Sequence, residues 1–334
     1  MVSIWVEPGF SESIWCRQIL QGLTSELKKR REPYTMQEDG DPVIVIGSSA
    51  EWLSAQVAEC NRAGQVPVLL CNSQRKISGG RYHCVCSDIA GSMRLLTAAM
   101  VRRWGPRLAL YGVNPQSVGD RSRREAFSLE CGGPCLENNG SLEACFREFL
   151  PLLDQVDGVI CANGFAAVSL YRRLLALGRS VPMISCGQTQ LCRRYGEAIP
   201  SVDENYGAFG KTALGILDLV RKDPQISELT VTVRWAGEQL PGSLPPVIPP
   251  AATDRFYRDG ELQQMQKVED LLNSCDETDR QLLPMLLAGQ SYALMAQACY
   301  LTEGAVKYRI KNMRLICDCA DRESLEAVLR SWLP

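Results

Sequence analysis

Fifteen cysteines and one histidine are the residues of this 334-residue chain whose types could support metal or redox chemistry. The closest cysteine pairs are Cys84 with Cys86, Cys131 with Cys135, and Cys317 with Cys319. Only the middle pair has a spacing that structural zinc uses, and a Cys₂His₂ site is excluded because His83 is the single histidine. Most other cysteines lie in apolar runs, where a reduced thiol packs as a small hydrophobe. We therefore expect reduced, mostly buried thiols and no bound metal in a cytoplasmic protein, with a metal site or a thiol switch as the alternatives.

No group of residues has the spacing of a recognisable catalytic site. The chain contains neither a GxSxG nucleophile elbow nor a GxxxxGK[ST] phosphate loop, and His83 has no evident nucleophile partner. We therefore expect a protein that is not an enzyme and that needs no cofactor. The 36 basic and 38 acidic residues argue against a chain-wide basic surface, yet they allow one small basic module. An apolar run of about 18 residues is missing, so no membrane partner is expected.

The first 220 residues alternate short apolar segments with longer amphipathic ones, which predicts strands and helices in turn. The expected strands are Ser3–Val6, Val43–Ile46, Val66–Leu70, Leu108–Val113, Gly158–Cys161 and Met183–Cys186. The expected helices include Ala50–Arg62, Ala90–Arg103, Phe165–Leu177 and Asn205–Val220. This rhythm predicts parallel sheets with helices on both faces. Polar residues that directly follow the strands are then the ones placed to bind a ligand.

The sequence changes character near residue 236. A strictly alternating segment, LTVTVRW at 229–235, predicts a late strand, and five prolines then fall within 236–254. Proline at this density excludes a helix and favours an extended spacer. We therefore predict a sensing domain over 1–240, a Pro-rich linker over 241–254, a connecting helix over 255–275 that packs in a core or at a dimer contact, and a compact all-helical unit over 276–334.

The C-terminal unit has the residue pattern of three short helices followed by a fourth. Asp276 is a plausible N-cap of the first helix and Thr302 of the third. The third helix carries basic residues on one side and apolar residues on the other. The basic residues are Lys307, Arg309, Lys311 and Arg314, and the apolar residues are Val306, Ile310, Met313 and Leu315. The alternative to a DNA-reading helix is an ordinary amphipathic helix with a solvated basic face.

Three segments of this unit carry a family resemblance: LLAG at 286–289, MAQACYLTEGAVK at 295–307 and DRESLEAV at 321–328. Over its whole length the unit resembles the LuxR-type helix-turn-helix family. The resemblance implies that Thr302 caps the recognition helix and that Lys307, Tyr308 and Lys311 face the major groove. It places Arg309 and Arg314 near the DNA backbone. The last helix resembles the one through which such domains dimerise.

Two departures from the LuxR-type pattern matter. Pro284 lies inside the first helix, where it removes a backbone hydrogen bond. The second helix reads YALM at 292–295, where the family usually places polar residues that touch phosphate. From Asp276 onward the chain has seven basic and eight acidic residues. We therefore expect modest, strongly salt-dependent non-specific affinity for DNA.

Eight segments of residues 1–240 resemble, in order, the effector-binding domain of the lac-repressor family. They are Ile4–Gly22, Pro42–Ser49, CSDIAG at 86–91, Arg107–Tyr111, Arg121–Phe127, DGVICANG at 157–164, Pro182–Gly187 and IPSVDENYGAFG at 199–210. The resemblance implies an α/β fold with two periplasmic-binding-protein-like lobes and a ligand in the cleft between them. It assigns 1–104 with 206–222 to one lobe, and 106–203 with 229–240 to the other. The family's DNA-binding role would here have moved to the C-terminal end.

The same resemblance indicates ligand-binding residues. Trp15 stands where the family often stacks an aromatic ring on a sugar or base, although a core tryptophan is the alternative. Arg123 matches an arginine that forks onto ligand hydroxyls or carboxylates, unless it is one surface charge in its basic run. Asn163 matches a ligand-contacting asparagine. The other candidates lie at strand ends or crossovers and are Ser48, Asp88, Gln188, Thr189, Glu204 and Asn205.

Gly164 and Gln188 replace two customary acids of this family. The resemblance implies a sugar or a similar polar effector, but these replacements argue against a typical pyranose, with a different polar small molecule or a degenerate sensor as the alternatives. The sequence as a whole predicts a homodimeric, ligand-responsive transcription regulator that binds inverted-repeat DNA. Its signal is expected to pass through the dimer interface and the Pro-rich spacer. The alternative is a ligand-binding or scaffold protein whose degenerate tail no longer binds DNA.

Overall fold

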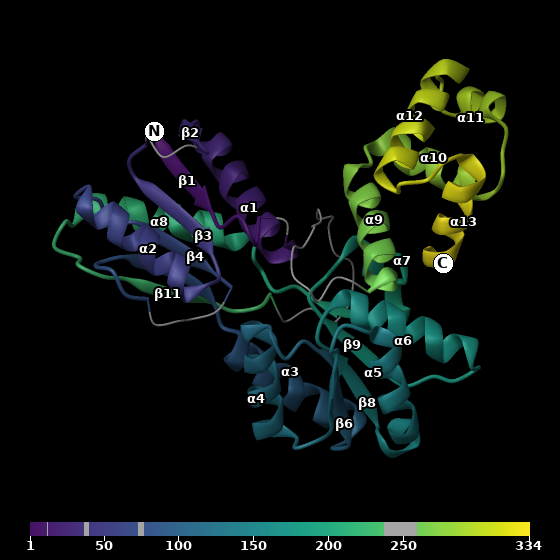
Figure 1. Ribbon diagram of the computed structural model, residues 1–334, viewed down its shortest axis with the longest axis horizontal. Helices are drawn as coiled ribbons and strands as arrows, with labels where there is room; N and C mark the ends of the chain where they lie inside the picture. Colours follow the sequence, from purple (N-terminus) through teal and green to yellow (C-terminus); the bar gives the residue numbers. More distant parts are fainter. Residues whose placement is uncertain (12, 37–39, 73–76, 237–258) are drawn as a thin grey trace.

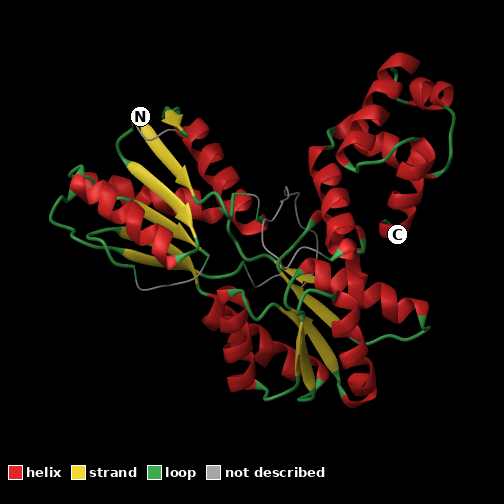
Figure 2. Cartoon of the chain, viewed as in Figure 1, coloured by secondary structure: helices red, strands yellow, loops and turns green. Residues whose placement is uncertain are grey.

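Two parallel β-sheets, each covered by helices on both faces, form the first two thirds of the chain, and a group of short helices forms the rest (Figure 1, Figure 2). This computed structural model describes residues 1–334 except 12, 37–39, 73–76 and 237–258. The predicted Pro-rich linker and the first residues of the predicted connecting helix lie outside the described residues. The predicted fold class, an α/β two-lobed domain followed by a small all-helical unit, is confirmed.

The first sheet has the strand order β11-β5-β4-β3-β1-β2. Its strands are β1 (Val2–Val6), β2 (Tyr34–Thr35), β3 (Val43–Gly47), β4 (Val68–Cys71), β5 (His83–Ser87) and β11 (Thr230–Val233). Alternate residues of β3 face opposite sides: Ile44 and Ile46 pack against α1 (Ile14–Arg30) and α8 (Ala208–Lys222), whereas Val45 packs against α2 (Ala50–Arg62). Both faces are thereby buried, as parallel sheets require.

The second sheet has the order β10-β9-β8-β6-β7. Its strands are β6 (Leu108–Val113), β7 (Cys135–Glu137), β8 (Gly158–Cys161), β9 (Met183–Cys186) and β10 (Ser201–Val202). One face packs on α3 (Ile89–Trp104) and α4 (Val118–Glu130). The other face packs on α5 (Leu142–Phe149) and α6 (Gly164–Ala176). Three short helical elements also belong to this lobe: η1 (Leu150–Gln155), α7 (Gln190–Arg194) and η2 (Gly196–Ala198).

The predicted division into lobes was wrong for two elements. Helix α3 was assigned to the first lobe, but Met93 and Met100 pack with β6, β8 and β9 of the second lobe. The late strand was assigned to the second lobe, but β11 pairs in parallel with β5 of the first. Helix α3 belongs to the second lobe because the chain crosses between the lobes after β5 and before α3. Strand β11 belongs to the first lobe because α8 packs on the first sheet and leads the chain to the edge position beside β5, as a parallel crossover does. Trp235, just after β11, packs in the second lobe and marks the last crossing.

The C-terminal helices begin with α9 (Gly260–Ser274), which precedes α10 (Glu277–Leu287), α11 (Tyr292–Ala298), α12 (Glu303–Ile316) and α13 (Arg322–Trp332). We call α10 to α13 the tail. Each helix of the tail starts at a side-chain cap. The caps are Asp276, Ser291, Thr302 and Asp321. Helix α10 contains Pro284 and continues past it to Leu287.

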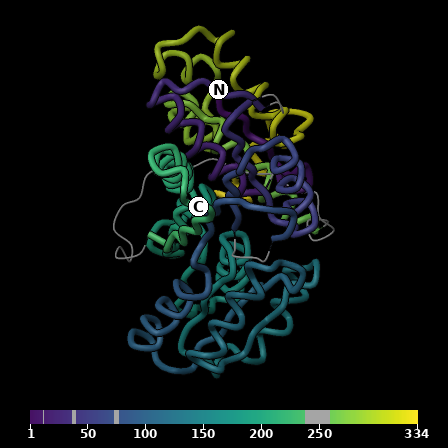
Figure 3. The backbone as a smooth tube through the Cα atoms, turned by 90° about the vertical axis from the view of Figure 1, so that its left-hand side faces the viewer, coloured from purple at the N-terminus to yellow at the C-terminus, as the bar shows by residue number. Residues whose placement is uncertain are grey.

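One hydrophobic cluster joins the second lobe to the tail through α9. It contains Phe149 and Leu191 of the lobe, Met265 and Leu271 of α9, and Trp332 of the tail, among others. Figure 1 and Figure 3, seen from directions 90° apart, both place the tail far from α3 and α4. Helix α9 therefore packs in a core within this chain, which is one of the two roles predicted for it.

The fifteen cysteines are unpaired, and eleven of them are buried. The described residues include no group of three or more histidine, cysteine, aspartate or glutamate side chains arranged to hold a metal ion. Within the same part of the chain, no helix combines the length and apolar character needed to cross a membrane.

Candidate ligand-binding pocket

A cavity of about 330 Å³ lies between the two lobes, where the carboxyl ends of both sheets meet. The chain segments that follow β1, β3, β4, β6, β7, β8 and β9 all contribute to its wall. Its lining residues are Gly9, Phe10, Ser13, Ile14, Trp15, Gln18, Ser48, Ser49, Asn72, Ile89, Asn114, Gln116, Ser117, Val118, Gly119, Asp120, Arg123, Asn138, Ala162, Asn163, Gly164, Phe165, Cys186, Gly187, Gln188, Thr189, Glu204, Tyr206 and Leu262. The volume and the mixed polar and aromatic lining suit one small polar molecule.

Seven of the nine predicted ligand-binding residues line this cavity. They are Trp15, Ser48, Arg123, Asn163, Gln188, Thr189 and Glu204. The structure does not bring the other two to it. Asp88 caps α3 instead, and its carboxylate accepts a hydrogen bond from the Gly91 amide at 3.0 Å. Asn205 has a left-handed backbone, with φ of 59°, and lines a separate cavity of about 280 Å³.

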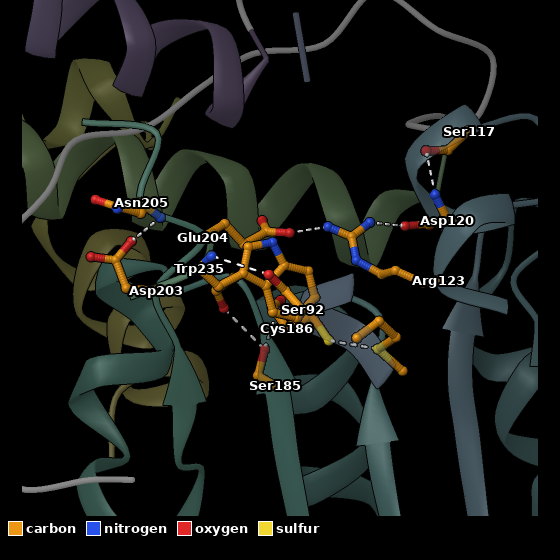
Figure 4. A network of polar contacts seen from close by, with 12 residues as sticks. Ser92, Ser117, Asp120, Arg123, Ser185, Cys186, Asp203, Glu204, Asn205 and Trp235 are labelled. Atoms are coloured by element: carbon orange, nitrogen blue, oxygen red, sulfur yellow. Dashed lines mark hydrogen bonds and ion pairs between the residues drawn. The ribbon is translucent and has the colours of Figure 1, made fainter. Parts of the chain in front are cut away.

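Arg123 is the centre of a buried charge network (Figure 4). Its side chain donates to the Oδ1 atom of Asp120 at 2.5 Å and to the Oε1 atom of Glu204. The other oxygen of Asp120 accepts from the Asn114 amide at 2.9 Å, and the Trp235 ring lies 5.7 Å from the guanidinium. Residues from α4, from the last part of the second lobe and from the final crossing therefore meet at one charge.

Burial and pairing act against each other in this network. Burial alone lowers the pKa of Arg123, which is only 7% exposed, but Glu204 and Asp120 outweigh it and hold that pKa well above its usual value. Burial also raises the pKa of both carboxyl groups, against the lowering effect of Arg123. That Arg123 forks onto ligand hydroxyls or carboxylates stays a prediction: it lines the cavity, and among the described residues its Nε has no hydrogen-bond partner. Its guanidinium already serves two protein carboxylates.

Side-chain amides supply most of the remaining polar lining. The asparagines are Asn72, Asn114, Asn138 and Asn163, and the glutamines are Gln18, Gln116 and Gln188. Each amide offers both donors and acceptors, which is what a ligand rich in hydroxyl groups needs. On one wall Trp15 packs against Phe10, with ring centroids 5.9 Å apart. Trp15 is half-buried, since it lines the cavity and also packs against the core cluster of the first lobe.

Several lining side chains also cap helices. Asn163 accepts from the Ala166 amide at 3.0 Å and starts α6, while Thr189 accepts from the Cys192 amide at 3.0 Å and starts α7. Ser117 plays the same part for α4. These contacts use the side-chain oxygens as acceptors, so the Asn163 amide hydrogens and the Thr189 hydroxyl hydrogen are the groups left to meet a ligand.

Sequence reasoning missed Phe10, Asn72, Asn114 and Asn138 among the lining residues. The signal was present for two of them, because Asn114 directly follows the predicted strand Leu108–Val113 and Asn72 lies two residues after the predicted strand Val66–Leu70. Asn138 follows β7, a three-residue strand that was not predicted. A polar residue directly after each apolar run is thus a more general signal here than similarity to one family motif.

The six predicted DNA-binding residues all lie at α12, but they differ in exposure. Thr302 caps α12 by accepting from the Ala305 amide at 3.2 Å. Lys307, Tyr308 and Lys311 are exposed, and Tyr308 exposes 65% of its surface. The two arginines have internal partners: Arg309 bonds Asp276 and Asp279, each at 2.8 Å, and Arg314 bonds the carbonyl groups of Cys319 and Ala320.

Comparison with known proteins identifies the class of fold. The chain matches no protein-family model, and no curated protein matches it in sequence. Solved structures do match. A LacI-family transcriptional regulator from Enterococcus faecium with bound ribose has 16% sequence identity and a TM-score of 0.56, over 72% of this chain and 97% of that chain.

Two further structures give the same picture. The transcriptional regulator CelR in complex with cellobiose has 16% identity and a TM-score of 0.53, over 70% of this chain and 82% of that one. A LacI-family regulator from Rhizobium etli has 14% identity and a TM-score of 0.56, over 70% and 95%. At such identities the likeness establishes the two-lobed, periplasmic-binding-protein-like fold.

Proposed function

We propose that this chain is a ligand-responsive transcription regulator of the cytoplasm, with a sugar-like effector bound between its lobes. The observation that carries the proposal is the amide-rich, aromatic-walled cavity at the carboxyl ends of both sheets. Support comes from the structures of similar fold, which include regulators bound to ribose and to cellobiose. The division into sensor, linker, connecting helix and DNA-binding unit is part of the proposal.

The charges of the pocket favour a neutral effector over an anionic one. Arg123 is the only cation among the lining residues of the described chain, and it is already paired with Asp120 and Glu204. A phosphate or carboxylate placed there would meet two buried acidic groups with no unshared cation to balance it. Hydroxyl groups, in contrast, pair well with the surrounding amides.

A thermal-shift screen tests the pocket. We expect one or more of ribose, cellobiose, other neutral sugars and nucleosides to raise the melting temperature of the full chain, and the matching sugar phosphates and sugar acids to have no effect. The shift should be lost in Trp15→Ala and kept in Trp52→Ala, a matched change on α2 outside the pocket. A shift that survives Trp15→Ala would place the ligand elsewhere.

The tail supplies the DNA-binding part of the proposal. Lys307, Tyr308 and Lys311 share the exposed side of α12 and are the groups we propose to contact DNA, whereas Arg309 and Arg314 hold the tail together. A homodimer would read an inverted repeat with half-sites about one helical turn apart. The expected result is a salt-dependent gel shift with the DNA upstream of the chain's own gene. Lys307→Ala with Lys311→Ala should abolish it, and Lys222→Ala on α8 should leave it unchanged.

The second candidate function is a ligand-binding or scaffold protein that does not bind DNA. It is favoured by one observation, namely that three of the four basic side chains predicted on α12 have partners within the tail: Arg309 and Arg314 as described, and Lys307, which pairs with Glu303 at 3.6 Å. The same gel shift decides between the two, because a scaffold would be indifferent to the substitutions at Lys307 and Lys311.

A further inference from the structure

Glu269, near the middle of α9, accepts hydrogen bonds from the first residues of α7, the helix that begins directly after pocket-lining residues. Its side chain is 2% exposed, and its two oxygens accept from the amides of Gln190 at 2.6 Å and Leu191 at 2.5 Å. These are the first two residues of α7. A helix start has unpaired N–H groups and a partial positive charge, so a buried carboxylate is a strong partner for it. The two residues directly before α7, Gln188 and Thr189, line the pocket.

Helix α9 reaches the pocket itself at its other end. Leu262 is one of the lining residues. Beside it, Glu261 accepts from the Ser169 hydroxyl at 2.8 Å and pairs with Arg173 at 2.6 Å, both on α6. The cap residue Asp259 accepts from the Leu142 amide at 3.0 Å. Helix α9 is therefore fixed to the second lobe at three separate elements, α5, α6 and α7.

The tail is fastened to the same assembly. The Trp332 indole donates to the Gln264 side chain of α9 at 3.3 Å, and the backbone carbonyl of Trp332 accepts from the Tyr195 hydroxyl at 2.8 Å. Arg172 of α6 lies over the indole ring at 4.2 Å. The end of α13 thus touches both α9 and the second lobe. A continuous set of polar and apolar contacts leads from the pocket wall to the last helix.

We propose that α9 is a wall of the ligand pocket, and that Glu269 is the positioning residue through which the pocket and the docked tail influence each other. A ligand that bonds Gln188 or Thr189 acts on the start of α7, and the two amide bonds to Glu269 carry that constraint to α9. Linkage then requires that the ligand's affinity differ between the docked and undocked arrangements of the tail.

This route lies within one protomer and needs neither the Pro-rich spacer nor a dimer interface. It rests on the proposed pocket but not on DNA binding. It also predicts coupling that exists before any ligand is added, since the contacts are present in the free chain. The test can therefore be made without knowing the effector, and its failure is distinguishable from failure of the proposed function.

Hydrogen–deuterium exchange on the full chain, followed by mass spectrometry of its peptides, measures the coupling. Glu269→Gln places an amide where both α7 donors need an acceptor. We expect exchange at residues 190–194 and also at 322–332 to rise about tenfold, because both depend on the position of α9. Asp270→Asn is the matched control: it removes the same charge one residue further along α9, and exchange at both segments should be unchanged.

The reciprocal variant keeps the test sharp should Glu269→Gln fail to fold. Trp332→Phe removes the indole bond to Gln264 at the far end of the pathway. The proposal requires faster exchange at the start of α7, which Trp332 does not touch through any hydrogen bond shown by the structure. Faster exchange confined to 322–332 in Trp332→Phe, or to 190–194 in Glu269→Gln, would overturn it.

Discussion

The two lobes share a fold but differ in whether their hydrophobic cores extend beyond the lobe. In the first lobe, one cluster lies under α1 and α8 and another under α2, and in the described residues neither cluster includes a residue of the tail. In the second lobe, the cluster under α5 and α6 continues through α9 to Trp332. By its packing the described chain divides into two bodies, the first lobe alone and the second lobe with α9 and the tail, and Ile14 of α1 contacts the second from the first. We therefore predict that any opening or closing of the cleft would move the tail relative to the first lobe.

The largest effect is expected at Arg123, where the second lobe meets the final crossings. Arg123→Ala leaves Asp120 and Glu204 buried without their cation, and breaking a buried pair costs about 3–5 kcal/mol. The control is Arg124→Ala, whose pair with Glu137 has side chains 37% and 32% exposed. It should cost less than about 1 kcal/mol. Urea unfolding of both variants measures the difference, and equal losses would contradict the buried network.

The next effect separates the two bodies directly. Leu271→Ala removes a buried side chain of α9 and should cost about 2–5 kcal/mol in the second lobe and tail. Leu53→Ala is the matched change in the first lobe, under α2. Hydrogen exchange should show each loss confined to its own body. If Leu271→Ala loosened the first lobe as much as the tail, the division into two bodies would be wrong.

A pH effect carried by Glu269 should appear in the second body. Burial raises the pKa of Glu269 from 4.5 to about 7, although the amides of Gln190 and Leu191 lower it. Between these values the native state keeps a proton that the unfolded state has lost, so stability falls as pH rises from about 4.5 to 7 and levels off above. The loss is on the order of 3 kcal/mol.

Unfolding midpoints measured from pH 4.5 to 8 check this effect. Glu269→Gln should remove most of the slope, whereas Asp270→Asn, its neighbour on α9, should retain it. A slope that is unchanged in Glu269→Gln would assign the pH dependence to other groups.

The smallest effect concerns the tail alone. Tyr195→Phe deletes the hydroxyl that bonds the Trp332 carbonyl and should cost about 1 kcal/mol. Exchange at 322–332 should rise, while the first lobe keeps its protection. Tyr82→Phe on the first lobe serves as the control. Equal exchange at 322–332 in both variants would show that this bond does not hold the tail.

The sequence predicted the strands and helices better than their partners. Local period and chain order were enough to place most elements of both sheets and all four helices of the tail. They could not assign α3 or β11 to a lobe, because an amphipathic helix or an alternating strand does not encode which sheet it joins. The same limit applied to α9, whose apolar side fits a core or a dimer contact equally well until its partners are seen.

In the pocket, too, the positions of residues were easier to predict than their partners. Residues after strands were found because parallel sheets gather their carboxyl ends at one edge. Asp88 follows β5 as the rule demands, yet its carboxylate is used to start α3. Arg123 was found by resemblance, but its two acidic partners were not recognised as partners: Asp120 lies three residues before it on α4, and Glu204 lies 81 residues further along the chain. What escaped prediction in each case was competition within the protein for the same polar group.

The helix caps in the pocket wall would constrain how the proposed effector preference can change over evolutionary time. Asn163 and Thr189 each line the cavity and cap a helix, and replacing such a cap costs about 0.5–2 kcal/mol of stability. A substitution at either position that suited a new ligand would therefore also lower the stability of the fold. Trp15 is half-buried and caps no helix, so a substitution there carries no capping cost. We therefore expect changes in ligand preference to arise first at the aromatic wall.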